Sequence, residues 1–405
     1  MKTLVYERNV ARFAASRVAS ALSGSGHGVT VGPLRLTDTG APELPGPQWR
    51  HVRPRLAGIC GSDLSTLDGK SSRYFEDVVS FPFVPGHEVV GTVQEDGTDT
   101  GQRVVVEPVL GCVPRGITPP CAACAEGRTG GCERTAFGHL APGLQIGYCT
   151  DTGGGWSHAG LVAHDTQLHA VPDELSDDDA VMVEPTACAV HAALAARVED
   201  GDCVAVIGAG TLGLTTIAAL RHLASPGTLL VGAKYPEQRH LAEDLGADVV
   251  VDPPQLERSV RRQSRSLVTT GSLTGGADVV VDCVGSASSI AQAVAMVRPR
   301  GRVVLVGMPG RTTLDLAALW HREVSLVGAY AYGTEEVGAL RRRTFDVALE
   351  VVRAARLGRL VSARYPLERF EDAIAHAGAA GRRGAVKVVF DLRTAAKRAD
   401  RGRVA

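Results

Sequence analysis

The pattern of apolar and polar positions divides the chain into two parts. From residue 203 to residue 327, short β-branched runs alternate with segments of helical spacing. Apolar strands separated by helices predict a parallel sheet built from βαβ units, and we expect that domain to span about 188–331. The strands and helices expected within it are 203–207, 212–223, 228–231, 237–245, 248–251, 278–282, 288–297, 302–306 and 324–327.

The flanking parts, 1–187 and 332–405, hold shorter and less regular elements. Segment 111–155 is rich in Gly, Pro and Cys and lacks periodicity, and such a long irregular stretch is unusual unless something staples it. We expect strands at 1–6, 51–59, 89–93, 103–106 and 385–390, helices at 8–22, 187–198 and 335–357, and a further helix starting at 177–179.

Composition narrows the class of protein. The chain has 405 residues, of which 44% are hydrophobic and 21% charged, with a net charge of -1. This balance is typical of two globular domains and favours no nucleic-acid partner. We find neither an apolar run of about 20 residues for a membrane span nor a secretory leader. We therefore expect the protein in the cytoplasm, where its nine cysteines are more often free or metal-bound than paired.

A glycine motif predicts a dinucleotide site. Gly208, Gly210 and Gly213 follow the spacing GxGxxG between an apolar strand and an apolar helix. The first permits the tight turn, the second lets the backbone approach a pyrophosphate, and the third lets helix and strand pack closely. N–H groups at the helix start then hold the phosphates, so we take these glycines and Leu212 as cofactor-binding residues. The alternative is a glycine cluster that serves helix packing alone.

The residues about 20 positions beyond this motif bear on the choice of cofactor. A carboxylate there commonly binds the ribose hydroxyls of NAD. Here position 233 is alanine, and Lys234 and Arg239 follow it. Cations without a repulsive carboxylate suit a 2′-phosphate, so we expect NADP rather than NAD. The alternative, that both cations are solvated charges at a helix start, stays open.

Two groups of residues have the composition of zinc sites. One is a run of four cysteines, which can close a tetrahedral structural site and staple segment 111–133. Its members are Cys112, Cys121, Cys124 and Cys132. The other is dispersed: Cys60 in GICGSD, His87 and Glu88 in PGHEVVG, and Glu184 in VEP. A thiolate, an imidazole and a carboxylate form a catalytic zinc set with one open position, although each residue alone is more often structural.

Taken together with GAGTLG and the strand ending in DCVG, these motifs carry a family resemblance. The chain resembles the zinc-dependent medium-chain dehydrogenase/reductase family, in its sorbitol, threonine and glucose dehydrogenase branch, from about residue 34 to 390. The resemblance implies an α/β protein with a β-rich, GroES-like catalytic domain in two segments, 1–187 and 332–405. It implies a structural-zinc lobe at about 111–133 and an inserted Rossmann domain at 188–331. Relatives form homodimers or homotetramers.

The resemblance also implies an activity and its residues. The protein would transfer a hydride between NAD(P) and an alcohol, polyol or sugar-type substrate and its carbonyl. Cys60, His87 and Glu184 would bind a catalytic Zn²⁺, with Glu88 as an outer or exchanging ligand. Ser62 would relay the substrate proton.

Three features depart from the family pattern. Eight residues separate Cys112 from Cys121, where two are usual, so the first ligand of the lobe comes from an enlarged loop. Ser65 stands where many relatives carry a relay histidine. About twenty extra residues near positions 10–30 lengthen the N-terminal part.

Two other functions compete with this interpretation. A zinc-free quinone reductase of the same superfamily lacks the set Cys60, His87 and Glu184, so the sequence argues against it. A non-catalytic zinc- and nucleotide-binding redox sensor needs no proton relay, so Ser62 argues against that function.

Overall fold

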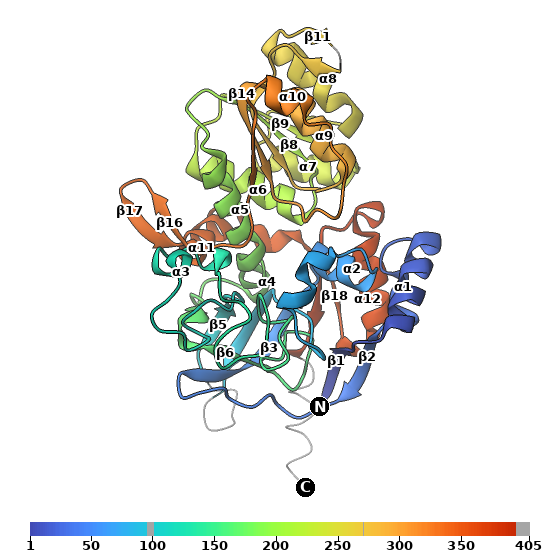
Figure 1. Ribbon diagram of the computed structural model, residues 1–405, viewed down its shortest axis with the longest axis vertical. Helices are drawn as coiled ribbons and strands as arrows, with labels where there is room; N and C mark the ends of the chain where they lie inside the picture. Colours follow the sequence, from blue (N-terminus) through green and yellow to red (C-terminus); the bar gives the residue numbers. More distant parts are fainter. Residues whose placement is uncertain (95–100, 270, 394–405) are drawn as a thin grey trace. The chain divides into compact units, whose positions relative to one another are not determined.

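The computed structural model describes residues 1–94, 101–269 and 271–393, which form two compact units. Unit 1 consists of Met1–Glu184 and of the chain from Arg356 to the end of the described residues, and unit 2 is Pro185–Ala355. Figure 1 colours the chain along its sequence, so the blue and red elements of unit 1 come from opposite ends of the chain. Unit 1 is therefore assembled from two segments that are far apart in sequence.

Unit 2 contains a six-stranded parallel sheet in the order β10-β9-β8-β13-β14-β15. Numbered along the chain, this is the 3-2-1-4-5-6 order of a doubly wound Rossmann sheet, so the predicted parallel α/β sheet is confirmed. The central strands are buried on both faces, which is why they read as continuous β-branched runs. The strands are β8 (Cys203–Ile207), β9 (Thr228–Gly232), β10 (Val249–Val251), β13 (Ala277–Asp282), β14 (Val297–Leu305) and β15 (Ser325–Gly328).

Helices connect these strands and cover the sheet, as α6, α7 and α9 do in Figure 1. None of the helices in the described ranges combines the length and the apolar character that a membrane span requires. The helices are α5 (Val183–Ala196), which begins at the end of unit 1, α6 (Thr211–Leu223), α7 (Pro236–Asp244), α8 (Pro253–Ser264), α9 (Ala287–Met296), α10 (Ala317–His321) and α11 (Thr344–Ala355). Two short strands, β11 (Val268–Thr269) and β12 (Ser272–Leu273), pair with each other.

The helix predicted over 335–357 is wrong in its first third. Residues there form an antiparallel hairpin of β16 (Thr334–Val337) and β17 (Leu340–Arg343), and the helix begins only afterwards. Gly338 lies in the turn with φ +61°, a conformation that favours glycine. The strands place Glu335 opposite Arg342, and such cross-strand pairs of opposite charge stabilise a hairpin.

Unit 1 is built on a seven-stranded sheet, with β18-β19-β3-β4-β5-β7 in order and β6 paired to β3. Strand β19 pairs antiparallel with β3, so the returning segment completes the sheet of the first segment. The strands are β3 (Trp49–Gly58), β4 (Val89–Val93), β5 (Arg103–Val106), β6 (Leu161–His164), β7 (Leu168–Ala170), β18 (Val361–Tyr365) and β19 (Lys387–Asp391).

Short helices and one further hairpin surround this sheet. Strand β1 (Lys2–Tyr6) pairs with β2 (Leu34–Asp38), and the residues between them form α1 (Val10–Ser23) and η1 (His27–Thr30). The other helical elements are α2 (Gly61–Leu67), η2 (Arg73–Val78), α3 (Ala122–Ala125), η3 (Thr129–Gly131), η4 (Asp165–Gln167), α4 (Asp177–Val181), η5 (Leu357–Leu360), η6 (Leu367–Arg369), α12 (Phe370–Gly378) and η7 (Ala380–Arg383).

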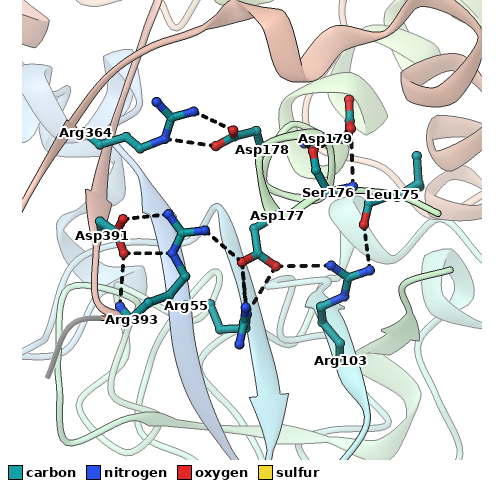
Figure 2. A network of polar contacts seen from close by, with 10 residues as sticks. All are labelled: Arg55, Arg103, Leu175, Ser176, Asp177, Asp178, Asp179, Arg364, Asp391 and Arg393. Carbon is teal, nitrogen blue, oxygen red and sulfur yellow. Dashed lines mark hydrogen bonds and ion pairs between the residues drawn. The ribbon is translucent and has the colours of Figure 1, made fainter. Parts of the chain in front are cut away.

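A polar network ties the two segments of unit 1 together. Figure 2 shows Asp177, at the start of α4, between the guanidinium groups of Arg55, Arg103 and Arg393. The side chain of Asp177 is 5% exposed. Its carboxylate oxygens lie 2.9 Å from Arg55 Nη2 and 3.1 Å from Arg393 Nη1. The C-terminal end of β19 is thus fixed to the first segment by charge as well as by the sheet.

Candidate functional site

Three of the predicted site residues converge in unit 1. Cys60 is the residue that precedes α2, and His87 and Glu88 precede β4. One ligand atom from each of the three lies within 4.8 Å of the others. Both His87 and Glu88 are buried. A thiol, an imidazole and a carboxylate gathered in this way have the composition of a zinc site.

Asp63 holds two members of this cluster in place. Its Oδ2 accepts the backbone N–H of Cys60 at 2.9 Å, and its Oδ1 lies 3.5 Å from His87 Nδ1. The phenol of Tyr148 donates to the same Oδ1 at 3.1 Å. Carboxylates behind a histidine commonly orient it toward a metal. Neither residue was predicted from the sequence, although Asp63 stands at the third position of α2, where an acidic side chain commonly caps a helix start.

The electrostatics of His87 show that the cluster suits a cation. Burial by itself would lower the pKa of His87, but the nearby negative charges of Asp63 and Cys60 outweigh it and raise the pKa well above its ordinary value. The surroundings of the imidazole are therefore negative. A divalent metal bound through Cys60 and His87 would supply the positive charge that these surroundings favour.

Glu88 is paired with a lysine that the sequence analysis did not select. Lys387, in β19, is buried, and its Nζ contacts both carboxylate oxygens of Glu88. Burial lowers the pKa of Lys387, but the charges of Glu88 and Cys60 outweigh this and raise it. The available signal was a lone lysine within the apolar run AVKVVF. Gly58 makes room for the pair, because a Cβ there would lie 1.8 Å from Glu88 Oε2.

Glu184 is placed differently from the other predicted ligands. It lies in the first turn of α5 and is buried. Its carboxylate is not part of the Cys60–His87–Glu88 cluster found among the described residues. Its charge nevertheless contributes to raising the pKa of Lys387. The structure thus gathers two of the three predicted catalytic ligands and leaves the third outside the cluster.

Ser62 lies on α2, two residues after Cys60, as the predicted relay requires. Burial raises the pKa of Tyr148, whose phenol donates to Asp63 Oδ1, well above its ordinary value. Thr66 Oγ1 lies 3.0 Å from Ser71 Oγ. Thr66 Oγ1 also donates to the backbone carbonyl oxygen of Ser62 at 3.0 Å, and Ser65 on the same helix stands where many relatives carry a histidine.

The four cysteines of the lobe also converge. Their sulfur atoms all lie within 4.8 Å of one another, and this includes Cys112 from the enlarged loop. Backbone N–H groups of Glu133 and Cys124 outweigh burial and lower the pKa of Cys121 to about 7, whereas burial raises that of Cys132 to about 11. One divalent cation among the sulfurs would stabilise the thiolate form of all four, so this donor set fits zinc.

Arg115 organises the chain around this cysteine cluster. Its side chain is fully buried, and its guanidinium donates to the carbonyl oxygen of Gly143 at 2.6 Å. Burial lowers the pKa of Arg115, while the nearby Cys149, Cys132 and Cys112 raise it. The group therefore places a buried positive charge beside the sulfurs. Its other acceptors are the carbonyl oxygens of Leu110, Phe137, Leu140 and Ala141.

The glycine motif in unit 2 has the geometry expected of a phosphate-binding turn. Gly208 follows β8 with φ +90°, and Gly210 immediately precedes α6. A Cβ on Gly213 would lie 1.9 Å from the carbonyl oxygen of Gly208, so helix and strand approach as closely as predicted. No described atom lies within 4 Å of a Cβ built on Gly210, which leaves its backbone accessible. Leu212 lies in the first turn of α6.

The two cations near position 233 have different surroundings. Arg239, on α7, donates to the carbonyl oxygen of Ala233 at 3.0 Å and forms an ion pair with Asp252. Lys234 lies in the loop after β9, with its ammonium 5.6 Å from the centre of the Tyr235 ring. Arg239 therefore supports the loop, and Lys234 is the cation with greater freedom to meet a ligand.

Comparisons with known proteins agree with this architecture. Residues 46–173 match the family described as alcohol dehydrogenase GroES-like domain, and residues 211–354 match the family described as zinc-binding dehydrogenase. The chain is 29% identical to L-idonate 5-dehydrogenase of Vitis vinifera over 92% of this chain and 98% of that protein. It is 30% identical to a sorbitol dehydrogenase of Arabidopsis thaliana over 86% of this chain and 89% of that protein.

Solved structures give the same result. A zinc-binding-dehydrogenase-like protein from Sinorhizobium meliloti, bound to NADP, is 26% identical with a TM-score of 0.67. The match covers 88% of this chain and 96% of that one. The likeness therefore extends over both units.

Proposed function

The chain belongs to the zinc-binding dehydrogenase family, and from this premise we propose that it transfers a hydride between NAD(P) and an alcohol carbon of a polyol or sugar-type substrate. The observation that carries the proposal is the cluster that the partly exposed Cys60 forms with the buried His87 and Glu88. The names of the relatives, L-idonate 5-dehydrogenase and sorbitol dehydrogenase, support this class of substrate.

We assign the catalytic zinc to Cys60, His87 and Glu184. Glu88 is already engaged by the ammonium of Lys387, which supports Glu184 as the permanent carboxylate ligand and Glu88 as an outer one. The assignment requires the Glu184 side chain to turn toward Cys60 when metal binds. Zinc bound there supplies a Lewis acid for the substrate oxygen, and the nicotinamide donates or accepts the hydride.

The residues of the chain then orient the reactants and move the proton. Ser62 would take up the hydroxyl proton of the alcohol during oxidation while its own hydroxyl proton passes on to solvent, and the phenol of Tyr148 lies nearby. Asp63 fixes both Cys60 and His87, so that the ligands keep their geometry between turnovers. Lys387 balances the buried charge of Glu88.

The remaining predicted sites serve structure and cofactor binding. We propose that Cys112, Cys121, Cys124 and Cys132 bind a structural zinc that staples residues 111–133. The catalytic domain would comprise about 1–187 and 332–405, and the cofactor domain about 188–331. The turn at Gly208, Gly210, Leu212 and Gly213 would hold the pyrophosphate. Lys234 would meet the 2′-phosphate of NADP, with Arg239 supporting its loop.

We further propose a cytoplasmic homo-oligomer. Reduced thiolates in the four-cysteine site favour a reducing compartment. Within the described parts of the chain, strand β15 pairs only with β14, and its Leu326 is exposed. An unprotected edge strand of this kind suits pairing with the same strand of a second copy.

The test is a panel of polyols, sugars and secondary alcohols with NAD and NADP, followed by nicotinamide absorbance and metal analysis. We expect turnover with a polyol or sugar-type alcohol and two zinc ions per chain. The Cys60→Ser variant should lose one zinc ion and its turnover. The Cys203→Ser variant, which changes a cysteine outside both clusters, should keep both zinc ions and its turnover. Turnover that survives loss of the metal in Cys60→Ser would reject the mechanism. Two bound zinc ions without turnover on any substrate would favour the redox-sensor alternative.

A further inference from the structure

The insertion between β1 and β2, residues 9–31, packs in an unusual way. An amphipathic helix normally buries its apolar side. In α1 the buried side chains are Ser16 and Ser20, while Val18 and Leu22 are 59% and 83% exposed. Contacts of polar side chains, rather than burial of apolar surface, therefore hold this helix against the rest of unit 1.

Asp68 is the centre of these contacts. It terminates α2 and is only 1% exposed. Its carboxylate accepts hydrogen bonds from Ser20 Oγ at 2.7 Å, from Ser25 Oγ at 2.6 Å and from the backbone N–H of Gly26 at 2.9 Å. The ammonium of Lys70 lies 3.0 Å from the same group. Three of the four donors belong to the insertion, so a buried charge of α2 depends on the insertion for its solvation.

The backbone fit around this carboxylate is close. Ser16 Oγ donates to the carbonyl oxygen of Leu67, the last residue of α2. A Cβ on Gly28 would lie 2.5 Å from the carbonyl oxygen of Ser16, and one on Gly26 would lie 2.5 Å from that of Ile374 in α12. The insertion thus contacts α2 on one side and α12 on the other, and Figure 1 shows α1, α2 and α12 as neighbours.

The opposite end of α2 belongs to the candidate catalytic site. Cys60 precedes the helix, and Ser62 and Asp63 lie in its first turn. The helix has seven residues, a length of about 10 Å, so only about two helical turns separate Asp68 from Cys60. We therefore expect a displacement of the helix at Asp68 to change the position of Cys60 as well.

We propose that the insertion is a positioning element of the active site, acting through Asp68. It fixes the end of α2, keeps Cys60 and Asp63 in register with His87, and slows the loss of metal from that cluster. The inference rests on the proposed function for its catalytic meaning. The contacts that carry it, between residues 9–31 and α2, are independent of that function.

The first test compares two zinc sites in one chain. Zinc release to an excess of chelator is followed in the wild type, in Asp68→Asn and in the milder Ser25→Ala. The phase that is missing in Cys60→Ser identifies the catalytic cluster. We expect that phase to accelerate about 10-fold in Asp68→Asn and less in Ser25→Ala, as for other residues behind metal ligands. Release from the four-cysteine lobe should stay at the wild-type rate.

Val18→Ser, on the exposed side of α1, is the matched control and should leave both phases unchanged. A purely stabilising role would accelerate both phases alike in Asp68→Asn, and that result overturns the proposal, as does no change in either phase.

A second measurement separates this proposal from the proposed function. Amide hydrogen exchange across residues 60–68 should be faster in Asp68→Asn than in the wild type, with or without zinc. If the wild type holds zinc in the lobe alone, the proposed function fails. In that case amide hydrogen exchange alone tests whether the insertion holds α2 in place, and unchanged protection of α2 in Asp68→Asn rejects the proposal.

Discussion

Asp177→Asn removes the charge at the centre of the network in Figure 2 and keeps the shape of the side chain. Burial raises the pKa of Asp177, but hydrogen bonds and charges from Arg55 and Arg393 outweigh it and lower the pKa. The folded protein therefore holds this residue as a carboxylate. Its replacement leaves Arg55, Arg103 and Arg393 directed at a neutral amide.

The expected loss of stability follows from burial. Removing one partner of a buried ion pair costs about 3–5 kcal/mol. The side chains of Arg55 and Arg393 are 41% and 36% exposed, so water screens part of the interaction, and we expect about 2–3 kcal/mol. Unit 1 has about 230 residues, for which this amounts to a fall in Tm of about 4–12 °C.

Asp178→Asn is the matched control, because it removes the same charge one residue further along α4. Asp178 pairs with Arg364, whose side chain is 40% exposed, and an exposed pair contributes about 0–1 kcal/mol. Calorimetry should therefore show that Tm decreases by less than about 4 °C. Equal shifts in the two variants would refute the assignment of Asp177 as the central charge.

The dependence of this Tm difference on pH provides a second test of the same prediction. Because the folded-state pKa of Asp177 is lowered, its contribution is present above the unfolded pKa of about 3.9 and is lost as pH falls through the folded pKa. The difference in Tm between wild type and Asp177→Asn should be full near pH 7 and shrink below about pH 4. A difference that stays constant over this range would contradict the electrostatic origin.

Three further substitutions test other parts of the account. Arg115→Met should accelerate zinc release from the four-cysteine lobe about 10-fold and leave the other zinc unchanged, because it removes a buried cation beside the sulfurs. Equal release from both sites would argue against that role. Lys234→Ala should weaken NADP binding about 10-fold or more by titration, with NAD unaffected, as expected for one lost charge-assisted hydrogen bond of about 1.5 kcal/mol. An unchanged ratio would remove Lys234 from the phosphate site. Lys387→Met should lower Tm by more than Lys387→Met combined with Glu88→Gln, because the single change leaves a buried carboxylate unpaired. Additive losses would indicate that the two groups act independently.

The sequence predicted unit 2 well because buried parallel strands give continuous apolar runs. Its sheet, from β8 to β15, follows the predicted order of elements. Helix α8 escaped prediction, since Leu256 and Val260 are its only buried side chains and the rest is polar. The hairpin at 334–343 was mistaken for a helix because Glu, Ala, Leu and Arg, which make up most of this segment, favour helices, and its tertiary surroundings override that propensity.

Sequence motifs selected Cys60, His87 and Glu88 but not the residues that support them. The motifs around Cys60 and His87 identified residues that the fold brings together. Lys387 lies about 300 positions from Glu88, and no local pattern reports such a contact. The role of Asp68 could not be predicted from the sequence either, because its partners in the insertion are serine hydroxyls and a backbone N–H, which produce no periodic pattern. Long-range hydrogen bonds of this kind require coordinates.

Anomalous diffraction at the zinc edge, from crystals of the purified enzyme, tests the central claim most directly. We expect two anomalous peaks per chain. One should lie among the sulfurs of the cysteine lobe, and the other should mark a zinc ion about 2.0–2.3 Å from Cys60 Sγ and from a nitrogen of His87. In the second site, Glu184 should have turned to complete the ligands. A single peak confined to the lobe, in crystals of catalytically active protein, would contradict the account.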